Sequence, residues 1–147
     1  MSSRPSDIIK AIIDYINYNK DDSEIPQKIH FDLLSIKDDS ICISSATQQL
    51  NEFKADVCPN WVQGELPLKF IYRRMVAVKE QTDYEVCDIL DSLVELLRKG
   101  YKEVNGNVKD FFIFRVTNIN SSKLERVYEN GCKDYSATIT VVYQREL

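Results

Sequence analysis

The residues able to carry nucleophilic chemistry are few. The 147-residue chain has one histidine, His30, so a cysteine–histidine pair is the only such arrangement that its composition offers. A single histidine also excludes a zinc site built on several histidines. The cysteines include no C-x-x-C pair, which argues against a zinc knuckle or a disulfide framework; they are Cys42, Cys58, Cys87 and Cys132. No local motif accompanies His30, so we interpret it as structural and the cysteines as reduced, mostly buried thiols.

Other catalytic patterns are missing as well. The sequence has no G-x-x-x-x-G-K, G-x-G-x-x-G or G-x-S-x-G motif, so neither phosphate cradling nor a nucleophile elbow is expected. Asp21-Asp22 and Asp38-Asp39 lie in polar segments, where aspartates bond to nearby backbone amides, and we interpret both pairs as turn residues. A solvated helix face accounts for Glu85, Asp88, Asp91 and Glu95. No catalytic, cofactor-binding or metal-binding residue is predicted, and we do not expect an enzyme.

Two features suit contacts between proteins instead. Arg73 and Arg74 are adjacent in a predicted strand, so one of them must point toward the apolar face. That arginine needs either a carboxylate partner within the chain or a subunit boundary, and the sequence leaves both open. Trp61, in a polar segment that begins near Phe53, either folds back on the domain or is an exposed aromatic anchor for a neighbour.

Length and composition predict one domain over residues 1–147 with the character of an ordinary soluble globular protein. The 19 Lys and Arg against 23 Asp and Glu give a net charge of −4, which argues against a sequence-specific reader of nucleic acid. No run of about 18 apolar residues could span a bilayer, and the start of the chain lacks the apolar core of a signal peptide. We therefore expect a protein made and kept in a cytosol, without membrane contact.

Two amphipathic helices are predicted from apolar residues at helical spacing. The first covers about residues 6–19, where five isoleucines form one stripe. The second covers about residues 82–99. It begins at a capping box formed by Thr82 and Glu85, and Gly100 provides its left-handed end.

The rest of the chain predicts strands. A polar turn at 37–40 indicates a hairpin of 29–36 with 41–43, and 45–65 is expected to be a long loop or a short bent edge strand. Alternation then predicts a long strand to residue 78, and a short buried strand at 111–116. Asn130-Gly131 predicts a hairpin of 124–128 with 135–143.

In the last of these strands Tyr135, Ala137, Ile139, Val141 and Tyr143 share one face. The opposite face carries Ser136, Thr138, Thr140 and Gln144, and it is either wet or pairs with a partner. The order of the elements predicts an α+β fold, with a mostly antiparallel sheet, two helices packed on one face and a C-terminal β-hairpin.

The chain resembles the tail terminator and minor capsid proteins encoded in the neck region of long-tailed bacteriophages and related prophages, particularly those of Gram-positive hosts. The resemblance covers nearly the full length. It rests on the first helix with its strand hairpin, the strand GELPLKFIYR at 64–73, the capped helix at Thr82 and the ending ENGCKDYSATITVVY at 129–143. This ending is similar to the "dG..dY...i.v.Y" close of such proteins. The polar stretch 44–60 is less typical.

The resemblance implies a non-enzymatic subunit, without cofactors, that assembles as a homo-oligomeric ring, commonly of six copies, on the last ring of the tail tube. Such a ring stops tube growth and presents a surface to the head connector or completion protein. The protein would then be made in the host bacterial cytoplasm and reside in the neck of the virion. Its acidic balance would let DNA slide through the lumen without sticking.

Two alternatives remain. The chain could be another neck component, such as a head completion protein or a tail-completion adaptor, or a cytosolic enzyme or ligand-binding protein without a recognisable motif. The second alternative requires a concave pocket with convergent polar groups. Under the ring hypothesis we expect contacts with neighbouring subunits at Phe53, Trp61, Arg73, Arg74, Thr138 and Thr140.

Overall fold

A computed structural model describes residues 5–26, 28–31, 39–45, 51–54, 61–75, 83–98 and 111–146. The elements, in chain order, are α1 (Pro5–Asn19), β1 (Ile29–Phe31), β2 (Ser40–Ser45), β3 (Asn51–Lys54), β4 (Trp61–Arg74), α2 (Asp83–Arg98), β5 (Phe111–Val127) and β6 (Lys133–Glu146). Both predicted helices are therefore confirmed, each within a residue of its expected bounds. In the described part of the chain, neither helix is long and apolar enough to cross a membrane.

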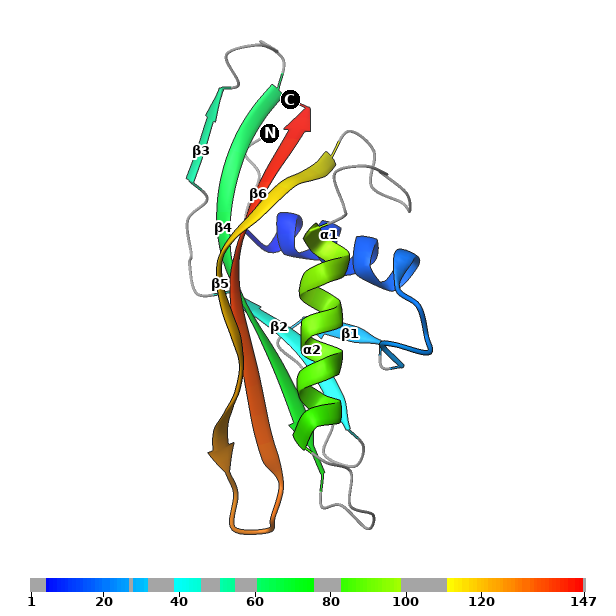
Figure 1. The fold of residues 1–147 in the computed structure, drawn as a ribbon. Coiled ribbons are helices and arrows are strands. Elements are labelled where there is room, and N and C mark those ends of the chain that lie inside the picture. The colour runs from blue at the N-terminus through cyan, green and yellow to red at the C-terminus, as the bar shows by residue number, and fades with distance from the viewer. Residues whose placement is uncertain are drawn as a thin grey trace.

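The strands form one mixed, mostly antiparallel sheet in the order β1-β2-β4-β6-β5, with β3 also paired to β4. Strand β4 is the centre of this sheet. It pairs with β6 without a break from Trp61↔Glu146 to Arg74↔Lys133. On its other side, β3 pairs with the first part of β4 and β2 with the last part. Strand β5 forms the free edge beyond β6 (Figure 1).

Both helices pack on the same face of the sheet, as expected for the α+β fold (Figure 1). Burial alternates along β4, and the buried positions are the even-numbered ones. On β6 the predicted core face is confirmed, because Tyr135, Ala137, Ile139, Val141 and Tyr143 are all buried. These side chains meet the apolar stripes of α1 and α2 in one continuous core.

One row across the sheet depends on a glycine. Gly64 on β4 lies directly opposite Tyr143 on β6 and Glu52 on β3. The buried Tyr143 ring lies over Gly64, and its hydroxyl is 2.8 Å from a Glu52 carboxylate oxygen, to which it donates a hydrogen bond. A Cβ atom on Gly64 would stand 2.5 Å from the Cζ atom of that ring. The missing side chain therefore lets the tyrosine reach β3 and hold it to the sheet.

The predicted hairpin of 29–36 with 41–43 is wrong, because β1 and β2 run parallel, with Ile29 opposite Ile41. Two side chains explain the difference. The Asn17 amide of α1 binds both the backbone N–H and the carbonyl of Ile29, at 2.9 and 3.1 Å, and so holds β1 against the helix. Asp39 accepts hydrogen bonds from the Tyr72 hydroxyl and the Met75 amide, and so fixes the start of β2 to the end of β4.

Other strand bounds differ too. Residues 61–65, expected to lie in a loop, begin β4, while β3 is a short edge strand, one of the two forms expected for this region. The separate strands predicted at 111–116 and 124–128 are one strand, β5. The pairing of β5 with β6 shifts register at four places, and Asn118 in the polar middle of β5 has a positive φ. Val76, Val78, Thr82 and Gly100 lie outside the described residues.

We predict that Gly64→Ala destabilises the protein by about 1–3 kcal/mol, because the new methyl group displaces the buried Tyr143 ring. In a strand without such a close contact the same change would be stabilising. Urea denaturation followed by circular dichroism measures the effect. The double variant Gly64→Ala/Tyr143→Leu should lose less stability than the sum of the two single changes. If Gly64→Ala is as stable as the parent protein, the position of the Tyr143 ring does not depend on the missing side chain at Gly64.

Candidate interaction surfaces

The face of the sheet opposite the helices, here called the outer face, carries an ion-paired cluster near the β5–β6 turn. The Arg73 guanidinium donates to both carboxylate oxygens of Asp134, with N to O distances of 2.9 and 3.0 Å. The Tyr128 hydroxyl donates to Asp134 at 2.6 Å and accepts from Arg73 at 2.8 Å. Arg126 stacks on the Tyr128 ring, 4.6 Å from its centre. The cluster fastens the turn to the end of β4.

Electrostatics in this cluster favour the charged forms. Burial of Asp134 opposes its ionisation, but the hydrogen bonds from Arg73 and Tyr128 outweigh burial and lower the pKa of Asp134 below its ordinary value. The hydrogen bond to Asp134 also raises the pKa of Arg73. Both groups therefore stay charged throughout the neutral range.

The two adjacent arginines point to opposite faces, as strand geometry requires. Arg73 lies on the outer face, where Asp134 is its partner within the chain. Arg74 is the one on the core side of β4, and it is 7% exposed and has an interaction partner of its own. Asp134 is thus the partner of the outer-face arginine, Arg73. The choice that the sequence left open concerns the core-facing arginine, Arg74, and the Arg73–Asp134 pair does not decide it.

The outer face of β6 is only partly exposed to solvent. Ser136 is 1% exposed, and its Oγ has no hydrogen-bond partner among the described residues. Thr140 is 9% exposed, and Asn118 of β5 lies 3.5 Å from its hydroxyl. Thr138 is half-buried and accepts a hydrogen bond from Asn120 at 2.9 Å. Strand β5 thus engages both threonines that the sequence assigned to contacts with a neighbouring subunit.

The aromatic pair expected at an interface lies at the other end of the sheet. Trp61 begins β4 and is half-buried, opposite Glu146 of β6, and it has an interaction partner within the chain. Phe53 is in β3, where its backbone pairs with Gln63; its side chain is outside the described part of the structure. Phe53 and Trp61 are thus both near the start of β4, whereas Arg73 lies near the other end of that strand.

His30 and Cys42 are opposite each other on β1 and β2. His30 is exposed and Cys42 is buried, and neither lines either of the two surface clefts described below. Cys132 is buried and Cys87 half-exposed, and all three described cysteines are free, which agrees with the expected thiols. Within the described residues, no group of three or more side chains could hold a metal ion.

A groove that the sequence did not suggest lies between α2 and residues 21–26, the segment that leads from α1 toward β1. It consists of two adjoining clefts of about 480 and 400 Å³, which share Glu24, Asp88 and Ser92. The apolar part of its lining comprises Ile25, Pro26, Val86, Ile89 and Leu96. Every charged residue of the lining is acidic, and these residues are Asp21, Glu24, Asp39, Glu85, Asp88, Asp91 and Glu95.

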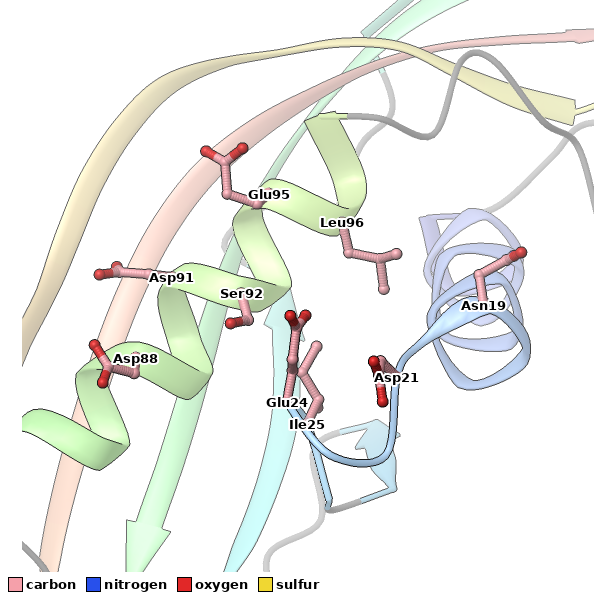
Figure 2. A pocket seen from close by; sticks show the side chains of 9 residues that line it. All are labelled: Asn19, Asp21, Glu24, Ile25, Asp88, Asp91, Ser92, Glu95 and Leu96. Carbon is pink, nitrogen blue, oxygen red and sulfur yellow. The ribbon is translucent and has the colours of Figure 1, made fainter.

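Figure 2 shows how this groove is arranged. Leu96 and Ser92 face the 21–25 segment, whereas the carboxylates of Asp88 and Asp91 lie along the flank of α2 turned away from it. Asp21 accepts hydrogen bonds from the hydroxyl and the amide of Ser23, which lower its pKa and confirm its role in a turn. The acidic face of α2 was visible in the sequence, but its proximity to the segment 21–26 was not.

We predict that Asp134→Asn costs about 2 kcal/mol of stability at pH 7, because Arg73 loses a charged partner in a largely buried position. The folded-state pKa of Asp134 lies below the unfolded value of about 3.9, so its contribution is complete above pH 4 and disappears as the pH falls through the lowered pKa. The difference between parent and variant should therefore shrink in acid.

Urea denaturation at pH 7 and at about pH 3 measures this difference. Glu125→Gln is the matched control, because Glu125 pairs with Lys69 at a more exposed position. That change should cost less than about 1 kcal/mol. Equal losses for the two variants, or a loss in Asp134→Asn that does not depend on pH, would show that the Arg73 cluster does not act as an ion pair.

Comparison with known proteins adds no assignment to these surfaces. No protein-family model matches the sequence, and no curated protein matches it. A functional hypothesis for this chain therefore has to be built from its residues, from their resemblance to phage neck proteins and from the geometry of its surfaces.

Proposed function

We propose that this protein is a structural subunit of the head–tail neck of a long-tailed bacteriophage or prophage. Copies assemble as a ring, with six as the expected number, on the end of the tail tube. The ring stops tube growth and presents its free surface to the head connector or completion protein. This role is non-enzymatic and needs no cofactor.

The proposal is carried by the resemblance of the C-terminal ending at 129–143, whose residues form the β5–β6 turn and most of strand β6. The strand at 64–73 lies within β4, and the second helix of the resemblance is α2. The strand hairpin expected after the first helix is not part of the support, because β1 and β2 are parallel.

Two features of strand β5 support this proposal, its free edge and its exposed apolar side chains. Strand β5 is a free edge of the sheet, and three large apolar side chains along it are exposed, namely Ile119, Leu124 and Val127. Free edges and exposed apolar residues are the usual sites of association with another chain. Repeated head-to-tail contacts close into a ring when the rotation between copies allows it.

We predict that the protein assembles into particles of about 103 kDa, the mass of six 17.1 kDa chains. Light scattering over a range of concentrations measures the mass, and negative-stain images test for a central hole. If the chain stays monomeric, binding to the ends of isolated tail tubes decides, since a tube can act as a template. A chain that neither forms rings nor binds tube ends contradicts the proposal.

We also predict that Trp61→Ala weakens assembly without lowering the melting temperature of the monomer, because an aromatic side chain at an interface contributes to association rather than to folding. Light scattering and thermal denaturation of the same samples separate the two effects. Tyr18→Ala removes an exposed aromatic ring from α1 and serves as the control. Equal loss of assembly and of monomer stability would instead assign Trp61 to the core.

A further inference from the structure

At the end of the sheet where β4 begins, two strands lie at opposite margins. The order there is β3-β4-β6-β5, and every neighbouring pair is antiparallel. Four rows of paired residues cross all four strands, from Lys54 and Phe111 to Asn51 and Arg115, with Phe114 as an extra residue of β5 at a register shift. Figure 1 shows β3 on one side of the β4–β6 pair and the start of β5 on the other. The two marginal strands therefore match in extent.

Neither of these strands pairs with a further strand in the part of the chain that the structure describes. A strand in this position presents a row of backbone N–H and C=O groups to whatever lies beside it. Natural edge strands are often protected by charged residues or proline. The first four residues of β5, at 111–114, have the sequence FFIF and contain neither. The lack of this protection indicates that another strand covers the edge.

The third strand at a margin of the sheet, β1, is closed at its first residue within the chain. The Asn17 amide binds the backbone N–H and the carbonyl of Ile29, so these two groups are not available to another strand. Strand β3 is held from its inner side instead, because Tyr143 of β6 reaches across β4 to Glu52. Its backbone is thus positioned before a partner binds, which reduces the entropy cost of association.

The directions of the strands fit a repeated contact. Strand β3 runs in the same direction as β6, and β5 runs opposite to both. When a second copy lies beside the first with its strands in the same directions, β5 of one copy meets β3 of the next as an antiparallel pair. Copies related by rotation about an axis along the strands keep these directions, so the contact can repeat around a ring.

We infer that the start of β5 in one copy, residues 111–115, pairs with β3 of the next copy, residues 51–54. The contact extends the sheet from copy to copy, and main-chain hydrogen bonds are its basis. Phe53 and Phe112 end the same row of the sheet, so each contact brings together an aromatic residue from both copies. This inference rests on the proposed ring function and names the two edges that build the ring.

Hydrogen exchange of backbone amides tests the contact. Rings are compared with a dilute, monomeric sample of the same protein by mass spectrometry of peptides. Peptides that cover 51–54 and 111–115 should exchange at least about tenfold more slowly in the rings, because their amides gain hydrogen bonds. The peptide that covers β1 should exchange equally in both samples. Rings in which the 51–54 and 111–115 peptides exchange as in the monomer would overturn the contact and leave the ring function standing.

Two variants each block one edge. Phe53→Asp places a charge in β3 and Phe112→Asp places one in β5, so each variant alone should need more than about tenfold higher concentration to form rings. Their equimolar mixture should contain pairs of about 34 kDa, twice the chain mass of 17.1 kDa, because each pair joins the two intact edges and leaves only blocked ones. Light scattering measures the masses, and thermal denaturation verifies that the variants fold. Rings in the mixture at the parent's concentration would overturn the contact.

The matched control is His30→Asp, which makes the same change in net charge at an exposed position of β1. It should assemble like the parent. Loss of rings in His30→Asp, with no effect of the two edge variants, would move the contact to β1 and overturn the inference. A parent that stays monomeric at millimolar concentration also refutes it, and binding to tail-tube ends then decides the proposed function separately.

Discussion

The unbroken antiparallel pairing of β4 with β6 is the constraint on which the rest of the structure depends. Because side chains alternate along a strand, a slip of β4 by one residue would turn its buried side chains, such as Phe70 and Tyr72, toward the outer face. Three features hold the register. Gly64 admits the Tyr143 ring at one end, Arg73 binds Asp134 at the other, and the apolar core fills the length between them.

The two sides of this central pair have different chemistry. On the core side, the strands and both helices exclude water and leave little room for polar groups, apart from Arg74 at the end of β4. On the outer face, Lys69 of β4 pairs with Glu125 of β5 across the intervening β6, and Arg73 of β4 pairs with Asp134 of β6. Among the described residues, acidic side chains gather along α2 and the segment before β1, where they line the two clefts.

The free edge at β5 is irregular along much of its length. Register shifts and the left-handed Asn118 interrupt the middle of the strand, which makes that stretch a poor template for another strand. The exposed apolar side chains Leu124 and Val127 lie near the hairpin end, on either side of the last register shift. An edge that is irregular in its middle and apolar at its tip favours a specific contact over open-ended sheet growth.

Local patterns in the sequence determined the two helices, the β4 core face, the last strand and the turn at Asn130-Gly131, because each depends on residues close together in the chain. The parallel pairing of β1 with β2 could not be read in this way. It depends on Asn17 and Tyr72, whose partners Ile29 and Asp39 are 12 and 33 residues away. Predicting β5 as two strands failed for a similar reason, since its polar middle remains a strand only through pairing with β6.

The same distinction between local patterns and distant contacts applies to the candidate interaction surfaces. The sequence alone determined that one of Arg73 and Arg74 must face the core and that α2 has an acidic face, because both follow from the period of the element. Only the tertiary structure decided that Asp134 is the partner of Arg73, that Ser136 and Thr140 are buried, and that α2 forms a groove with residues 21–26. These facts depend on segments distant in the chain meeting in space, and hydrophobic burial brings them together without leaving a local signal in either segment.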